Sequence, residues 1–196
     1  MKNAVLFGGT FNPFHIGHFE ITAALCERSE IDNVFIMPDR IPPHKSALQL
    51  APDEDRIEMC RIASGNFEKA QVLTVEFERE GKSYTFDTVC ELEKRYPDIS
   101  FAMACGGDML ATLDNWYRGE ELIHKIGFYA FKRVGEQGFE AHVSRLRKMG
   151  ANITVIDKNI TAVSSTELRQ TLSNGQKTEL IPTDIYNFVI KRKLYR

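Results

Sequence analysis

Short apolar runs alternate with amphipathic segments along almost the whole chain. The apolar runs are nearly continuous, which is expected for strands of a sheet that is covered on both faces. Six runs predict such strands: Ala4–Phe7, Val34–Met37, Val72–Val75, Phe101–Cys105, Phe128–Phe131 and Ile153–Ile156. The segments between and after them have helical spacing: Phe19–Arg28, Asp55–Ser64, Phe86–Arg95, Arg118–His124, Glu140–Met149 and Thr183–Lys191. This order predicts an α/β fold with a doubly wound parallel sheet.

The whole pattern fits one domain. A chain of 196 residues, 43% of them hydrophobic, is long enough to bury a core, and no repeat or linker interrupts it. We therefore expect a single domain over residues 1–196, with a small helical part from about 164 to 196. The segment Met37–Pro52 is rich in proline and polar residues, so we expect a functional loop rather than a domain boundary.

Composition and charge argue against several classes of function. The chain has 25 Lys and Arg against 27 Asp and Glu, which favours neither nucleic-acid binding nor a membrane-surface role. No apolar run approaches the roughly 20 residues of a membrane span, and Ala4–Phe7 is too short for a signal peptide. The four cysteines form no Cys-x-x-Cys pair, so we expect free thiols and a cytoplasmic protein. The sequence leaves the oligomeric state open, and a homo-oligomer is compatible with it.

A glycine turn and a histidine pair follow the first predicted strand. Gly8 and Gly9 let the backbone turn sharply and approach a phosphate, and the following helix directs its N-terminal amides to the same place. His15 and His18 lie beside Gly17 at the start of that helix, where both rings can donate hydrogen bonds to a triphosphate and Gly17 leaves room for the nucleotide. A Gly-Gly pair is common and a lone histidine is more often structural, but the combination indicates phosphate binding.

A second candidate phosphate element follows the last predicted strand. Ser164 and Glu167 form a capping box, which predicts the start of a helix. The hydroxyls of Ser165 and Thr166 would face outward beside the helix amides, and Arg169 lies one turn further, in reach of a β- or γ-phosphate. Taken alone, the segment is also explained by an ordinary capped helix with a surface arginine.

Together the two segments resemble the nucleotidyltransferase superfamily with the His-x-Gly-His motif, which implies a Rossmann-like fold. In that superfamily the motif binds the triphosphate and assists attack on the α-phosphate. The Ser-Ser-Thr-x-x-Arg pattern is similar to that of nicotinate mononucleotide adenylyltransferases and differs from the Lys-Met-Ser-Lys-Ser motif of class I aminoacyl-tRNA synthetases. The resemblance implies these ATP contacts: Gly8, Gly9, Thr10, Phe11, His15, Gly17, His18, Gly106, Asp108, Ser164, Ser165, Thr166 and Arg169.

Three further segments carry the resemblance to the nicotinate mononucleotide branch. They are Pro-Pro-His-Lys at 42–45, Ser-Tyr-Thr-x-Asp-Thr at 83–88, and Gly-x-Asp at 106–108 with a tryptophan downstream. The resemblance implies these contacts with the acceptor, nicotinate mononucleotide: His44, Lys45, Tyr84, Thr85, Asp108, Trp116, Tyr117 and Arg133. From residue types alone, Lys45 offers a cation, Thr85 is a candidate helix N-cap, and Trp116 is also explained as a core aromatic.

Two positions depart from the family pattern. Asn12 stands where the family commonly has Asp, and we expect its role in the turn to survive because Asn keeps the hydrogen-bonding geometry. Gly107 stands where alanine is more usual, which we expect to be a mild change.

The implied reaction joins nicotinate mononucleotide to ATP, giving deamido-NAD and pyrophosphate. The acceptor phosphate is already an oxyanion at neutral pH, so catalysis needs in-line alignment and charge stabilisation rather than a general base. We expect His15, His18, Lys45 and Arg169 to be catalytic, with Mg²⁺ carried by the ATP phosphates and no metal site built by the protein. Two alternatives stay open: a transferase for another phosphorylated acceptor, including nicotinamide mononucleotide, and a non-catalytic nucleotide sensor.

Overall fold

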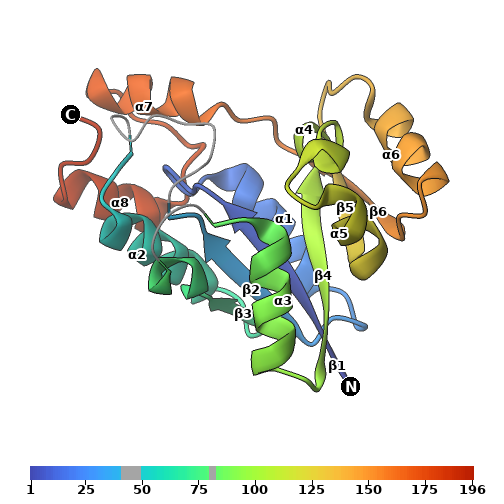
Figure 1. Cartoon of the computed structure of the whole chain (residues 1–196). Coiled ribbons are helices and arrows are strands. Elements are labelled where there is room, and N and C mark those ends of the chain that lie inside the picture. The colour runs from blue at the N-terminus through green and yellow to red at the C-terminus, as the bar shows by residue number, and fades with distance from the viewer. Residues whose placement is uncertain (41–49, 80–82) are drawn as a thin grey trace.

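The computed structural model describes residues 1–40, 50–79 and 83–196. Within these ranges it contains a six-stranded sheet in the order β3-β2-β1-β4-β5-β6 (Figure 1), and every pair of neighbours is parallel. The strands are β1 Lys2–Gly9, β2 Asn33–Pro38, β3 Ala70–Val72, β4 Ile99–Gly106, β5 Gly127–Arg133 and β6 Ile153–Ile160. The strand order reverses between β1 and β4, as in doubly wound folds, so the predicted fold class is confirmed.

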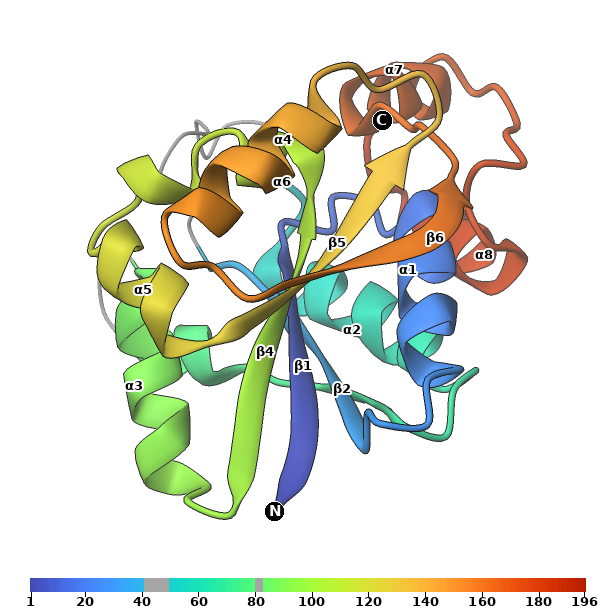
Figure 2. The ribbon, with the colours of Figure 1, turned by 90° about the vertical axis from the view of Figure 1, so that its right-hand side faces the viewer.

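Helices cover both faces of the sheet (Figure 2). They are α1 Ile16–Cys26, α2 Asp53–Ser64, α3 Thr85–Arg95, α4 Gly107–Leu110, α5 Gly119–Lys125, α6 Phe139–Lys148, α7 Ser165–Ser173 and α8 Thr183–Lys191. Residues of α1, α2, α7 and α8 share one buried cluster with Val5 and Phe7, and residues of α3, α5 and α6 share a second with Ala4 and Leu6. Consecutive side chains of β1 thus point to opposite helical layers. In the described ranges, no helix is long and apolar enough to cross a membrane.

The third strand lies earlier in the chain than the apolar run predicted. The run suggested Val72–Val75, but only Ala70–Val72 pairs with β2. Val75 begins a 3-10 helix, Val75–Glu78, and is buried against the second cluster. The apolar run continues past the end of β3 because Val75 is buried in the second cluster, although it pairs with no strand.

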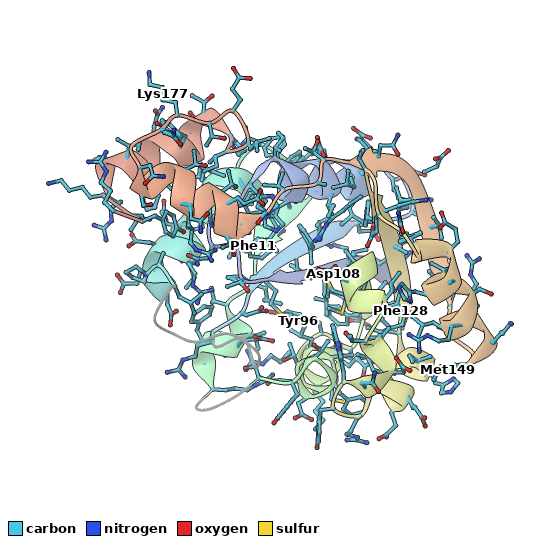
Figure 3. All side chains as sticks on the ribbon, turned by 90° about the horizontal axis from the view of Figure 1, so that it is seen from above. Phe11, Tyr96, Asp108, Phe128, Met149 and Lys177 are labelled. Carbon is cyan, nitrogen blue, oxygen red and sulfur yellow. The ribbon has the colours of Figure 1, made fainter. Side chains whose placement is uncertain are left out.

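The carboxyl ends of β1 and β4 meet beside each other at the switch point of the sheet, where ligands bind in this architecture. The loop before α1 follows β1, and α4 follows β4 without a break. Figure 3 looks down on this end of the sheet, with Phe11 and Asp108 labelled on the two segments. Both candidate phosphate elements and the acceptor segment at 106–108 therefore start from one edge of the sheet.

Candidate active site

The two motif histidines stack on each other at the start of α1. His15 is the N-cap of the helix, and the two imidazole rings lie 3.6 Å apart between centroids with 16° between their planes. The backbone amide of His15 donates to Nδ1 of His18 over 3.3 Å. Because Nδ1 of His18 accepts this bond, its neutral ring carries the proton on Nε2. His18 can therefore present an N–H donor while its other nitrogen caps the helix.

Burial keeps the His15 ring neutral. The residue is 6% exposed, and desolvation, together with the nearby positive charge of Arg133, lowers the His15 pKa from 6.5 to about 3. At neutral pH the unliganded protein thus holds His15 as an imidazole, so we expect it to act as a hydrogen-bond donor rather than a fixed cation. Arg133 is the last residue of β5, so its charge acts on His15 from the carboxyl end of a different strand.

Aromatic side chains hold the loop between β1 and α1. The Phe11 and Phe14 rings stack at 5.2 Å, and both contact the His18 ring, at 4.9 and 5.2 Å between centroids. Phe11 is 1% exposed and has a φ of 46°. Its side chain belongs to the core. If Phe11 contacts ATP as predicted, the contact has to come from its backbone. A Cβ on Gly9 would lie 3.1 Å from the Phe11 ring, which explains the glycine there.

Gly17 is required by packing against the protein itself. A Cβ at this position would lie 2.9 Å from the backbone oxygen of Thr161, so packing alone accounts for the glycine, and the room it leaves for a nucleotide stays a prediction. The carboxylate of Glu20 accepts bonds from the amide and hydroxyl of Thr161, both at 2.7 Å. Glu20 was missed by the sequence analysis, and it ties α1 to the segment that leads into α7.

The helix predicted after Ser164 forms, and a residue of this second candidate phosphate element contacts the first. Ser164 caps α7, and its Oγ accepts from the amide of Glu167 at 3.3 Å. Nη1 of Arg169 donates to the carbonyl of Asn12 at 3.0 Å and to that of Ser165 at 3.1 Å, and Nη2 donates to Oγ1 of Thr166 at 3.2 Å. The structure therefore brings Arg169 against the loop that precedes the histidine pair.

Asn12 joins segments that lie far apart in the sequence. Its Oδ1 accepts from the amide of Ala51 at 3.0 Å and from the hydroxyl of Tyr195 at 2.8 Å. Asn12 is 4% exposed, and burial raises the pKa of Tyr195. Both bonds use a side-chain oxygen that Asp would also offer, so the predicted survival of the turn role has a physical basis. The sequence analysis missed Tyr195 as a partner of this loop.

The segment after β4 brings Asp108 and Arg133 together. Oδ2 of Asp108 lies 3.5 Å from Nη1 of Arg133, and both side chains are partly exposed, with Asp108 at 62%. A Cβ on Gly107 would lie 2.0 Å from Oε1 of Glu136, whose other oxygen accepts from the amide of Arg133 at 2.9 Å. An alanine at this position would require the flexible Glu136 side chain to shift.

Exposed aromatic rings lie next to the start of α3. Tyr84 and Tyr117 are 38% and 50% exposed, and their ring centroids lie 4.6 Å apart. Tyr84 is the N-cap of α3, so the prediction of Thr85 as N-cap is wrong, and Thr85 is the first helical residue. Trp116 packs against the second core cluster, and its Nε1 donates to the Thr112 hydroxyl at 3.2 Å. Trp116 is therefore partly a core residue, and the half-exposed remainder of its side chain stays available for the predicted acceptor contact.

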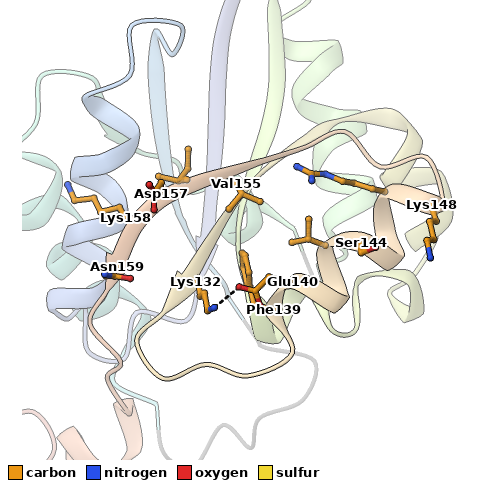
Figure 4. Close-up of a pocket in the computed structure, with 12 residues that line it drawn as sticks. Lys132, Phe139, Glu140, Ser144, Lys148, Val155, Asp157, Lys158 and Asn159 are labelled. Atoms are coloured by element: carbon orange, nitrogen blue, oxygen red, sulfur yellow. Dashed lines mark hydrogen bonds and ion pairs between the residues drawn. The ribbon is translucent and has the colours of Figure 1, made fainter.

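Two predicted residues, His44 and Lys45, lie outside the described residues. In the described part of the chain, no group of three or more His, Cys, Asp or Glu side chains could hold a metal ion. A cavity of about 800 Å³ lies between α6 and the edge strand β6 (Figure 4), and the Lys132–Glu140 ion pair of 2.5 Å lines it. None of the residues predicted to bind ATP or the acceptor lines this cavity, so the site is assigned by its chemistry rather than by cavity size.

Comparisons with known proteins identify the family of the chain. The family model for cytidylyltransferase-like proteins matches residues 6–171. The chain is 35% identical to nicotinate-nucleotide adenylyltransferase of Bacillus subtilis over 196 residues, covering 100% of this chain and 99% of that protein. It is 37% identical to a probable nicotinate-nucleotide adenylyltransferase of Exiguobacterium sibiricum over 191 residues, or 97% of each.

A solved structure of Plasmodium falciparum nicotinic acid mononucleotide adenylyltransferase complexed with NaAD has a similar fold. It matches with a TM-score of 0.82 and 22% identity over 100% of this chain and 98% of that one. At that identity the likeness shows the fold, while the bacterial relatives show the family. The chain belongs to the nicotinate-nucleotide adenylyltransferase family of cytidylyltransferase-like proteins.

Proposed function

We propose that this nicotinate-nucleotide adenylyltransferase binds ATP at the carboxyl ends of β1 and β4 and transfers its AMP group to nicotinate mononucleotide. The products are deamido-NAD and pyrophosphate. The observation that carries the proposal is the contact between the two phosphate elements: Arg169 of α7 bonds the Asn12 carbonyl, directly before the His15–His18 pair. This contact joins the loop that leads to the two histidine rings with the guanidinium and the N-terminus of α7, all of which can donate to phosphate oxygens.

The triphosphate would lie between the start of α1 and the start of α7. Nε2–H of His18, the neutral His15 ring and the Arg169 guanidinium are the donors available there. Ser165 and Thr166 occupy the first turn of α7, where amides of the helix lack internal partners. ATP would enter as its Mg²⁺ complex, with the ion held mainly by the phosphates and water, as is usual for Mg²⁺ bound with a nucleotide.

The acceptor would lie on the side of β4 and β5. Asp108 can accept from a ribose hydroxyl, and Arg133, 3.5 Å away, can neutralise an acidic group of the mononucleotide. The exposed rings of Tyr84 and Tyr117 and the half-buried Trp116 offer stacking surfaces for a pyridine ring. We propose that His44 and Lys45 meet the acceptor phosphate, which the family pattern supports.

In-line attack needs the acceptor phosphate aligned with the α-phosphate of ATP. The attacking group is an oxyanion at neutral pH, so no residue has to remove a proton from it. The protein contributes alignment and stabilises the charge that develops on the leaving pyrophosphate, which are the main sources of rate in phosphoryl transfer. We also propose that the reaction takes place in the cytoplasm.

Replacing His18 tests this assignment. His18→Ala is expected to lower kcat by about 100-fold or more, because removal of one preorganised donor typically has an effect of this size. Pyrophosphate release with Mg-ATP and nicotinate mononucleotide measures the rate, and a thermal melt checks that the variant is folded. His124→Ala, at an exposed histidine of α5, is the matched control. A folded His18→Ala protein with near wild-type turnover would refute the catalytic role.

A further inference from the structure

Arg56 is a fully buried charge on the apolar face of α2. It shares that face with Met59, Cys60 and Ala63, at the i, i+3, i+4 and i+7 positions of the helix, and its exposed fraction is 0%. Arginine is almost never fully buried unless its guanidinium is held by partners. The partners of Arg56 therefore indicate what the residue does.

Three of its four acceptors are backbone carbonyls of two different loops. Nη1 donates to the Thr10 carbonyl at 3.0 Å and to the Asp39 carbonyl at 2.6 Å. Nη2 donates to the Arg40 carbonyl at 3.2 Å and to Oδ1 of Asp53 at 2.6 Å. Thr10 follows β1, and Asp39 and Arg40 follow β2. A single nitrogen thus connects the ends of two neighbouring strands.

The ion pair with Asp53 alone does not explain why Arg56 is buried. Asp53 has 47% of its side chain exposed, so an arginine that served only this carboxylate could lie at the surface. The buried fork instead holds carbonyls, which a planar guanidinium with several fixed donors does better than an ammonium. The amide of Asp39 also donates to the Gly9 carbonyl at 2.9 Å, so the ends of β1 and β2 are joined by a direct backbone bond as well.

We propose that Arg56 is a positioning residue that sets the spacing between the ATP loop at Thr10 and the segment at Asp39–Arg40. This inference rests on the proposed function, in which Thr10 lies in the triphosphate loop and His44 and Lys45, which follow Arg40 in the sequence, meet the acceptor phosphate. Arg56 is fully buried and its guanidinium is held by carbonyls of both loops, so it is expected to act through these loops rather than on a substrate. Its loss changes how the two reacting phosphates meet, while each substrate keeps its own contacts.

The test compares turnover with the binding of each substrate alone. In Arg56→Lys and Arg56→Met, kcat is expected to fall by about 100-fold, because an error of about 1 Å between reacting groups has an effect of this size. The dissociation constants of ATP without acceptor and of nicotinate mononucleotide without ATP, measured by calorimetry, are expected to stay within about threefold of wild type, less than 1 kcal/mol. Lysine keeps the charge but not the fork, so it is expected to restore folding more than turnover.

Two matched variants on α2 serve as controls. Asp53→Asn removes the ion pair of Arg56 and leaves the three carbonyl bonds, and Arg61→Met removes an arginine whose side chain is 61% exposed. Both are expected to keep kcat within about twofold of wild type, as surface changes usually do.

Three results would overturn the proposal. The first is wild-type kcat in a folded Arg56→Lys protein, and the second is a binding loss for either substrate as large as the loss in kcat. The third is an Arg56→Lys chain that does not fold, because the residue then acts on the whole fold. These results differ from a failure of the proposed function. In that case the unsubstituted protein itself would release no pyrophosphate with Mg-ATP and nicotinate mononucleotide.

Discussion

Acid should destabilise this protein through His15, and the structure sets the size of the effect. The folded chain holds the pKa of His15 at about 3, against 6.5 for an unburied histidine. The unfolded chain therefore takes up the proton first as the pH falls. Stability from the neutral ring is fully present above pH 6.5 and is lost as the pH falls toward 3.

The magnitude follows from the two pKa values. The unfolded chain is about a quarter protonated at this site at pH 7 and almost fully protonated at pH 4, while the folded chain takes up little, and integrating this difference gives about 3 kcal/mol of unfolding free energy. His15→Gln removes the titrating group but keeps a polar side chain at the N-cap of α1. The variant is expected to be less sensitive to acid by this amount, whatever its stability at pH 7.

Urea unfolding followed by the fluorescence of Trp116, the single tryptophan, measures this difference at pH 7, 6, 5 and 4. The free energy of unfolding of wild type minus that of His15→Gln should fall by about 3 kcal/mol over the range. Other titrating groups cancel in the difference. His124→Gln, at an exposed histidine of α5, is the control and should follow the wild-type profile. Parallel profiles for wild type and His15→Gln would refute the buried neutral ring.

Three more predictions use other parts of the structure. Burial and the charge of Asp39 raise the pKa of Glu76 to about 7, so the folded carboxyl releases its proton later than the unfolded one as the pH rises. Glu76→Gln should therefore stabilise the protein against urea by about 2 kcal/mol more at pH 8 than at pH 5, and an equal effect at both would contradict this. Tyr195→Phe removes a bond to Asn12 and should lower the unfolding free energy by about 1 kcal/mol, whereas an unchanged value would show the bond to be unimportant. Trp116→Ala should raise KM for the mononucleotide far more than KM for ATP, and equal rises would indicate a packing role.

Single strands and helix starts were predictable from the sequence. Buried strands such as Ala4–Phe7 and Phe101–Cys105 have continuous apolar runs, and both phosphate elements begin at helix starts with recognisable residues. The apolar and helical runs predicted the fold class correctly, and the resemblance of the motifs predicted the family and the activity correctly. The third strand was predicted too late in the chain because an apolar run indicates which residues are buried but not which residues pair with a neighbouring strand.

The connections between segments were not predictable. Arg56 could have been noticed as a charge on the apolar stripe of its helix, but only the fold shows that Thr10 and Asp39 are its partners. The same holds for Glu20 with Thr161, which lie 141 residues apart. Such contacts depend on the packing of whole elements, and residue type alone does not specify a partner.

Product analysis tests the central claim most directly. The protein is incubated with Mg-ATP and either nicotinate or nicotinamide mononucleotide, and the dinucleotides and pyrophosphate are quantified by mass spectrometry and a coupled assay. The account predicts deamido-NAD and pyrophosphate in equal amounts from the nicotinate substrate. ATP binding without pyrophosphate release would identify a nucleotide sensor, and product from the amidated mononucleotide alone would contradict the assigned acceptor.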